Sequence, residues 1–342
     1  IVLALVAGVG MTKAGSKYKT QDKVNLIFAN VTSNSAKKAG EKFKELVEEY
    51  SDGDITVDLF QDNQLGDDKT AAEGVQNGDI DIAVSSSSSL STLYKDYYIY
   101  DTPYLFLNSQ EVYDVGFDGK AAQEMLKGVS KVGLKHMAMW ENGFRNYTNN
   151  DHAIETPADC KGQKIRTMEN PIHLKAWKSI GANPTPMAFS ELFTAMQQGT
   201  VDGEENPIGI IYSNRFYEVQ KYISLTQHVY TPYVVVMNPD KYDSLTDEQQ
   251  EIIDKAMKEA SAYQLEVSAK DEEEGIKEME KYGCEVNTLT DDQKKEFQKL
   301  IEDADVFSLA KSSMEHPEYF DKIQKELTQY RDCLLYTSPS PR

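Results

Sequence analysis

The segment between Thr246 and Gly283 contains no proline and no other strong stop signal, and this constrains the fold more than any other stretch. Thr246 and Gln249 have the spacing of a capping box, in which each side chain bonds to the other residue's backbone N–H. The pattern predicts a helix of about 37 residues, roughly 55 Å long. Gly275 is a candidate position for a bend in it. Because this helix is too long for one ordinary domain, we expect it to connect two.

Two units in which strands alternate with amphipathic helices precede this segment. In the first unit we predict strands over residues 24–30, 55–60 and 80–84, with helices from Ser33 or Asn34 to about residue 50 and over residues 67–77. The second unit begins near Arg145, with a strand over residues 163–166, helices over 172–180 and 190–198, and strands over 224–228 and 233–237 that return toward the first unit. Such alternation is typical of an α/β sheet, whose binding sites lie beyond the carboxyl ends of the strands.

The composition argues against nucleic acid as a partner. The chain has 342 residues, enough for two domains, and carries 56 acidic against 36 basic residues, for a net charge of −20. Phosphate binding needs clustered Lys and Arg, which a chain this acidic does not favour. The acidic surface favours solubility and mildly repels an anionic ligand. That repulsion is screened over about 8 Å at physiological salt, so a local pair of arginines can dominate inside a cleft.

No pattern in the sequence indicates catalysis, a metal or a cofactor. The five histidines are scattered without metal-ligand spacing, and neither a nucleophile elbow nor a phosphate loop occurs. Glu204 and Glu205 are the one acidic pair near the proposed cleft, but sequence neighbours usually point apart. Cys160, Cys284 and Cys333 give neither a disulfide framework nor a zinc site. We expect Cys160 and Cys284 to be free and buried, with a bridge between them as the alternative.

Both ends of the sequence are interpreted as lying outside the fold. Residues 1–16 begin with a ten-residue apolar run and resemble the remnant of a secretory signal peptide, too short to span a bilayer. Residues 333–342 interrupt a charged helical pattern and resemble translated sequencing-adaptor read-through. We expect them to be disordered, and we expect the sequence to be a fragment at both ends.

Arg145 and Arg166 are the candidate ligand-binding residues of the second unit. Arg145 follows a mostly apolar run over residues 132–140, and Arg166 ends the predicted strand over residues 163–166. A guanidinium at a strand end can direct its planar fork of N–H donors into a cleft, which matches the geometry of a carboxylate. Asn206 lies in a turn-forming cluster and can present its amide beside them.

The same region carries a family resemblance through its long ordered motifs, which read GFRNYTN from residue 143, TPADCKGQKIR from 156, GANPTPMAFSELFTA from 181 and VDGEENP from 201. With these motifs the chain resembles the solute-binding subunits of tripartite ATP-independent periplasmic (TRAP) transporters, of the dicarboxylate-binding type, over residues 24–330. The resemblance implies an α/β fold of the two-lobed periplasmic binding protein (Venus-flytrap) kind with a long hinge-spanning helix. Lobe I would comprise residues 24–143 and 232–271, and lobe II residues 144–231 and 272–331, with crossings near Asn142, near Pro232 and along the helix.

The resemblance also assigns roles to individual residues. It implies that Arg166 anchors the ligand carboxylate in a bidentate pair, that Arg145 is a second ligand-side arginine, and that Asn206 supplies an amide contact. Many members of the family carry Gln at the position of Glu204, so the charge beside Asn206 departs from the pattern. Ser86 lies in a run of five serines, at a position that helps to choose the ligand in the family. Asn170 and Phe189 are further candidates, as a polar contact and a ring wall.

The implied function is that of an extracytoplasmic, periplasmic binding protein and not of an enzyme. It would capture a small organic acid between its lobes, close around it as a monomer, and deliver it to the membrane subunits of a sodium-driven TRAP transporter. The ligand would be a sugar acid such as a uronate or aldonate, or a C4-dicarboxylate. The residues of the motifs favour the sugar acid. An extracytoplasmic ligand-sensing module of a signalling system is the alternative function, with the same site.

Overall fold

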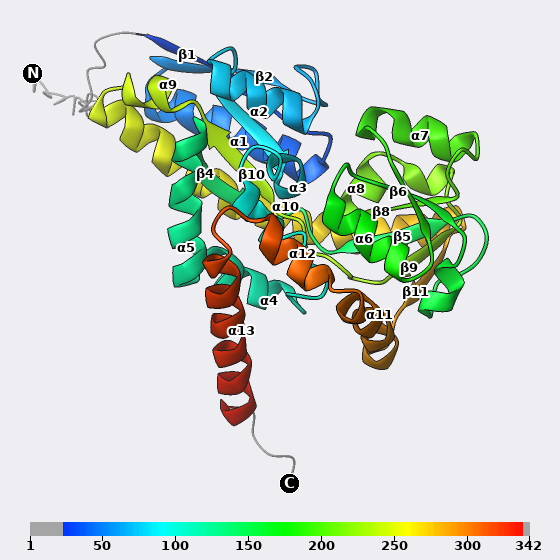
Figure 1. The fold of residues 1–342 in the computed structure, drawn as a ribbon. Helices are drawn as coiled ribbons and strands as arrows, with labels where there is room; N and C mark the ends of the chain where they lie inside the picture. The colour runs from blue at the N-terminus through cyan, green and yellow to red at the C-terminus, as the bar shows by residue number, and fades with distance from the viewer. Residues whose placement is uncertain (1–22, 338–342) are drawn as a thin grey trace, which may run out of the picture.

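Two β-sheets organise the computed structural model, which describes residues 23–337 (Figure 1). The first sheet has the order β2-β1-β3-β10-β4, and the second has the order β11-β9-β5-β8-β6-β7. We call the elements around these sheets the first and the second lobe. The strands of the first sheet are β1 (Val24–Ala29), β2 (Ile55–Phe60), β3 (Ile82–Ser86), β4 (Lys135–Trp140) and β10 (Tyr233–Met237). Those of the second are β5 (Arg145–Asn149), β6 (Lys164–Thr167), β7 (Asn183–Pro186), β8 (Gly203–Pro207), β9 (Tyr222–Leu225) and β11 (Glu285–Thr288).

Helices cover both sheets. Those between the strands of the first sheet are α1 (Asn34–Tyr50), α2 (Asp68–Asn77), α3 (Ser87–Leu90), η1 (Lys95–Ile99), α4 (Ser109–Glu111), the π-helix η2 (Val112–Phe117), α5 (Lys120–Lys127) and η3 (Gly128–Val132). The second lobe contains η4 (Pro157–Cys160), α6 (Pro171–Ser179), α7 (Phe189–Gln197), α8 (Ile208–Ser213) and η5 (Phe216–Glu218). The chain ends with α9 (Pro239–Asp243), α10 (Asp247–Tyr282), α11 (Asp291–Asp303), α12 (Val306–Ser313) and α13 (Glu318–Thr337).

The predicted α/β pattern of the first unit is confirmed. The parallel pairing of β1 with β2 and β3 requires helical crossovers, and α1 and α2 supply them. One face of α1 buries Ala36, Ala39, Phe43 and Leu46 completely or almost completely. That apolar stripe has the period of a helix that packs on a sheet.

The chain passes between the two sheets in two short segments. Residues 141–144 lead from β4 to β5, and residues 226–232 lead from β9 back to β10. An isolated antiparallel bridge joins Phe144 to Tyr230, so the two segments lie side by side. The predicted strand over residues 224–228 therefore ends early, at Leu225, because the chain leaves the second sheet there.

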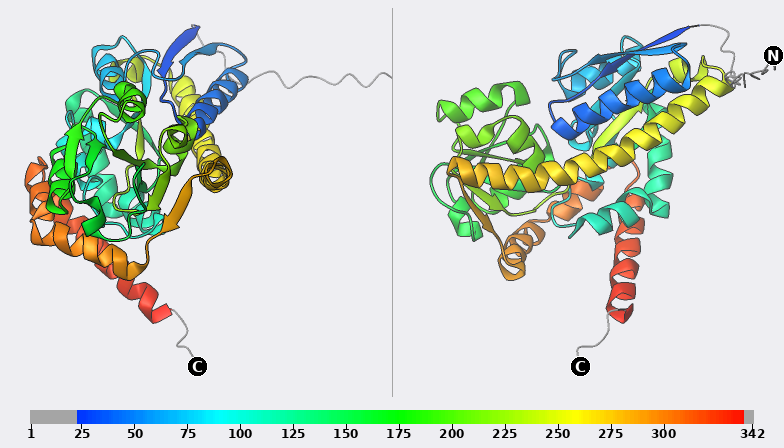
Figure 2. Two further views of the ribbon diagram at one scale, coloured as in Figure 1. Left: turned by 90° about the vertical axis from the view of Figure 1, so that its right-hand side faces the viewer. Right: turned by 180° about the vertical axis from the view of Figure 1, so that it is seen from behind.

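The predicted long helix is α10, which runs through both lobes (Figure 2, right). Its capping box between Thr246 and Gln249 is formed, and Gly283 ends it in the left-handed conformation. It packs on α1 and β4 of the first lobe and on α8 of the second. The helix continues through Gly275, where a Cβ atom would lie 3.1 Å from the Tyr212 Cβ. We conclude that this glycine permits close packing of α8 and does not interrupt the helix.

The C-terminal region requires two corrections. Residues 272–331 were assigned to the second lobe, but α13 packs on α5 and η2 of the first lobe, where Arg331 pairs with Glu111. In addition, α13 continues to Thr337, so residues 333–337 are helical and not disordered. Between Glu318 and Pro339 the sequence has no proline or glycine, so nothing local stops the helix earlier. The remaining predictions for the ends of the chain concern residues 1–16 and 338–342. These residues lie outside the described residues.

Cys160 and Cys284 are free and buried, as expected. Among residues 23–337, no helix combines the length and the apolar character that a membrane crossing requires.

Candidate functional site

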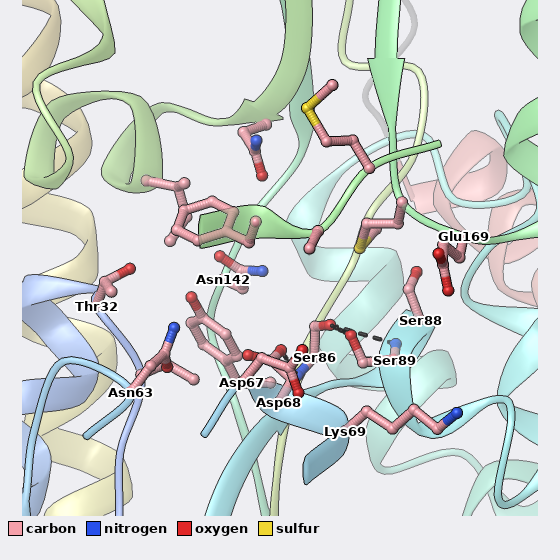
Figure 3. Close-up of a pocket in the computed structure, with 18 of the residues that line it drawn as sticks. Thr32, Asn63, Asp67, Asp68, Lys69, Ser86, Ser88, Ser89, Asn142 and Glu169 are labelled. Atoms are coloured by element: carbon pink, nitrogen blue, oxygen red, sulfur yellow. Dashed lines mark hydrogen bonds between the residues drawn. The ribbon is translucent and has the colours of Figure 1, made fainter. Parts of the chain in front are cut away.

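A cavity of about 310 Å³ lies between the two lobes. In Figure 3 the labelled polar side chains of the first lobe come from blue and cyan segments and face the green segments of the second lobe. The first lobe contributes Val31, Thr32, Asn63, Asp67, Asp68, Lys69, Ser86, Ser88, Ser89, Thr92 and Tyr233, and Asn142 lies on the crossing segment. The second lobe contributes Arg145, Arg166, Met168, Glu169, Met187, Ala188, Phe189, Asn206 and Ile210. The cavity is therefore lined by segments that lie far apart in the sequence.

Arg166 lines this cavity and has one donor nitrogen without a partner. It lies on β6, between β7 and β8, and only 2% of it is exposed. Its Nε and Nη2 donate to the Met187 carbonyl oxygen at 3.1 and 2.8 Å, whereas its Nη1 is buried without a hydrogen-bond partner. Burial and the neighbouring Arg145 lower the pKa of Arg166 to about 10, so it stays protonated at neutral pH. A buried cation with a free N–H edge is a site for an anion.

Arg145 lines the same cavity, but most of its donors are engaged within the protein. Its Nε and Nη2 donate to the Glu205 carboxylate at 2.5 and 2.9 Å, and Nη2 also donates to the Asn206 Oδ1 at 3.1 Å. His228 Nε2 lies 3.0 Å from the same Glu205 carboxylate. Burial alone would raise the pKa of Glu205, but Arg145 and His228 hold it well below its usual range. Arg145 therefore contributes less net positive charge to the cavity than Arg166 does.

Glu204 and Glu205 belong to one strand, β8, and have different partners. Glu204 accepts hydrogen bonds from Asn206 Nδ2 at 2.5 Å and from Thr148 Oγ1 at 3.0 Å. Burial raises the pKa of Glu204 to about 7, despite the bond from Asn206. The raised pKa favours the protonated form of Glu204, which reduces the negative charge that it adds beside Asn206.

The structure brings five of the six predicted site residues together. Arg145, Arg166 and Asn206 line the cavity with Phe189, whose ring centre lies 5.9 Å from the Arg166 guanidinium carbon. Ser86 lines the opposite wall and shares a hydrogen bond with Ser89 at 3.0 Å.

Asn170 is the exception, because it does not line the cavity. Its side-chain oxygen caps α6 by accepting from the Ile172 N–H at 2.9 Å, and its Nδ2 donates to Asp101 at 2.7 Å. The Asn-Pro pair at residues 170–171 is a helix-start signal, and the capping role explains why the side chain turns away from the cavity.

The acidic segment after β2 was not among the predicted site residues. Asp67, Asp68 and Lys69 all line the cavity, and Asp68 accepts a bond from the Ser86 N–H at 2.7 Å. Burial raises the pKa of the Asp68 carboxyl. These residues follow the carboxyl end of β2, where a binding site is expected in an α/β sheet. Applied to the predicted strand over residues 55–60, that rule could have found them.

A two-lobed α/β fold with an interlobe cavity beside a buried arginine, one of whose donor nitrogens has no partner, is typical of a solute-binding protein. No group of three or more potential metal ligands occurs among residues 23–337. A family model described as bacterial extracellular solute-binding protein, family 7, matches residues 28–305. The chain belongs to this family, whose members are binding components of TRAP transporters and not catalysts.

Two relatives that are named for the acid they bind align with most of this chain. The 2,3-diketo-L-gulonate-binding periplasmic protein YiaO of Escherichia coli is 38% identical over 73% of this chain and 76% of its own length. The C4-dicarboxylate-binding protein DctB of Bacillus subtilis is 33% identical over 76% of this chain and 75% of its own.

Solved structures agree with this fold. The sugar acid binding protein DctPAm of Advenella mimigardefordensis, in complex with galactonate, has a TM-score of 0.85 and 30% identity, over 90% of this chain and 99% of that one. A TRAP periplasmic solute-binding protein of Sulfurospirillum deleyianum with bound succinate has a TM-score of 0.82 and 31% identity, over 89% and 99%.

Proposed function

We propose that this protein captures a sugar acid, that is, a polyhydroxylated monocarboxylate such as an aldonate or uronate, in the periplasm and as a monomer. It then delivers the acid to the membrane subunits of a sodium-coupled TRAP transporter. The buried Nη1 of Arg166 carries the proposal, since it is the free donor of a cation enclosed by both lobes. The ligand carboxylate bonds to Arg166, beside Arg145 and Asn206, with Phe189 against its carbon chain.

The opposite wall favours hydroxyl groups over a second carboxylate. It carries the hydroxyls of Thr32, Ser86, Ser88, Ser89, Thr92 and Tyr233 and the amides of Asn63 and Asn142. Its charged groups are Asp67, Asp68 and Lys69, so its formal charge is negative if both carboxyls are ionised. Carboxylates accept hydrogen bonds from the hydroxyls of a polyol, and side-chain hydroxyls both accept and donate them, whereas a second carboxylate would be repelled by carboxylates of the same charge in a buried site.

The relatives support this class of ligand without deciding it. YiaO is named for a sugar-derived acid, and the structure of DctPAm holds galactonate. Succinate in another neighbour and the name of DctB represent the dicarboxylate alternative.

A thermal-shift panel tests the proposal with the purified chain. It compares D-galactonate, D-glucuronate, D-galacturonate, D-erythronate and succinate with neutral D-galactose. An acid at 100 times its Kd adds about 2.7 kcal/mol to the free energy of unfolding and raises the Tm by several degrees. We expect a shift from one or more sugar acids and none from galactose. A shift from succinate alone would contradict the sugar-acid assignment, and no shift from any acid would contradict carboxylate capture.

A further inference from the structure

Asp101 is a buried carboxylate that joins the two lobes. It lies between β3 and β4 of the first sheet, just after η1, and is completely buried. Its Oδ2 accepts the 2.7 Å hydrogen bond from Asn170 Nδ2, and its Oδ1 lies 3.2 Å from His173 Nε2. Asn170 and His173 belong to the start of α6, between β6 and β7 of the second sheet. The contact therefore crosses from one lobe to the other.

The start of α6 is suited to a carboxylate from outside. A helix N-terminus carries partial positive charge and favours a nearby anion. The first turn of α6 has no acidic residue of its own. The side-chain oxygen of Asn170 accepts a hydrogen bond from the Ile172 N–H, so the Nδ2 of the same amide can donate across the interface. Asp101 thus supplies from the first lobe the negative charge that α6 lacks.

The same carboxylate is one hydrogen bond away from the cavity. Ser88 Oγ donates to Asp101 Oδ1, and Ser88 lines the cavity. On the other side, Glu169 precedes Asn170 directly and also lines the cavity, three residues after Arg166. Asp101 therefore contacts both the wall of the first lobe and the end of the segment that carries Arg166.

We propose that Asp101 is an interlobe latch, formed when the lobes close on a ligand and broken when they open. It acts as a positioning residue: it does not touch the ligand, and it holds the start of α6 against Ser88 so that Arg166 stays over the cavity. The latch rests on the proposed function only for the identity of the ligand. A permanent structural contact, unchanged by opening, is the competing explanation.

The Asp101→Asn variant separates these explanations. A latch stabilises only the closed state, so the ligand-free Tm should equal that of the wild type. The dissociation rate of D-galactonate, measured by stopped-flow fluorescence, should rise about 10- to 100-fold with little change in the association rate, the loss expected for a hydrogen bond to a charged group. A lowered ligand-free Tm with an unchanged dissociation rate would overturn the latch.

Asp96→Asn is the matched control. Asp96 is equally buried, lies in η1 and also contacts a histidine, His316, at 2.7 Å. His316 precedes α13, which packs on the first lobe, so this contact does not join the two sheets. We expect this variant to lower the ligand-free Tm and to leave the dissociation rate unchanged. If the wild type binds no acid of the panel, the proposed ligand class fails, and the ligand-free Tm of Asp101→Asn alone decides the latch.

Discussion

Arg166 and Arg145 differ in the groups to which their guanidinium nitrogens donate within the protein. Two of the Arg166 nitrogens donate to the Met187 carbonyl, and this fixes the direction of the third. A lysine has a single ammonium group and cannot hold that carbonyl while it meets a ligand in the same geometry. We therefore expect Arg166→Lys to weaken binding of the acid identified in the panel by about 2–5 kcal/mol, measured by titration calorimetry.

The control for this prediction is Arg215→Lys, at an exposed arginine that pairs with Glu218 on the surface. It should leave the affinity unchanged. Equal affinity of Arg166→Lys and the wild type would mean that the carboxylate binds elsewhere in the cavity.

Glu204 makes stability depend on pH. Its pKa of about 7 in the folded protein exceeds the ordinary value of 4.5, so the folded state binds a proton more tightly than the unfolded state. The resulting stability is fully present below pH 4.5 and is lost as the pH rises through 7, a loss of about 3 kcal/mol. Glu204→Gln should remove this component, so that its Tm falls less than that of the wild type between pH 5 and pH 8. Exposed Glu191→Gln should behave as the wild type, and parallel curves for all three proteins would refute the assignment.

The partners of these residues could not be predicted from the sequence, although the residues themselves could. Strand ends, turn-forming residues and the family motifs identified Arg145, Arg166 and Asn206. The pairing of Arg145 with Glu205 depends on the antiparallel register of β5 and β8, in which Tyr147 lies opposite Glu205. Strand register is set by the packing of a whole sheet, so a local sequence pattern does not reveal it.

At the level of secondary structure, local sequence signals were sufficient to predict both ends of α10. They were insufficient to predict where α13 packs. A capping box and a terminal glycine define both ends of α10, whatever it packs against. The lobe on which α13 packs depends on long-range contacts, such as the pair of Arg331 and Glu111. The sequence contains these residues without indicating that they meet.

Gly275 tests how closely α8 must approach α10. Alanine would gain about 0.5–1 kcal/mol from helix propensity, but its Cβ would lie 3.1–3.3 Å from atoms of Tyr212 and Ile208. Overpacking of this kind costs about 1–3 kcal/mol, so we expect Gly275→Ala to lower the Tm. Gly209→Ala, in α8 itself, is the control: apart from its chain neighbours and the backbone of its own helix, no atom lies within 4 Å of the added Cβ, and the variant should raise the Tm. A raised Tm for Gly275→Ala would show that α8 can shift.

For the whole molecule, the charge and the site act in opposite directions on an anionic ligand. The net charge of −20 repels the ligand at long range, whereas the cavity arginines attract it at short range. The Debye length shortens from about 30 Å at 0.01 M salt to about 8 Å at 0.15 M, so added salt screens the distant surface charge more than the enclosed arginines. We expect the association rate of a monoanionic sugar acid to rise about two- to threefold over this range, measured by stopped-flow fluorescence. The dissociation rate should stay nearly constant, because it depends on contacts inside the closed cavity. An association rate that falls with salt would mean that the field of the arginines already reaches the bulk solvent and that the acidic surface does not oppose capture.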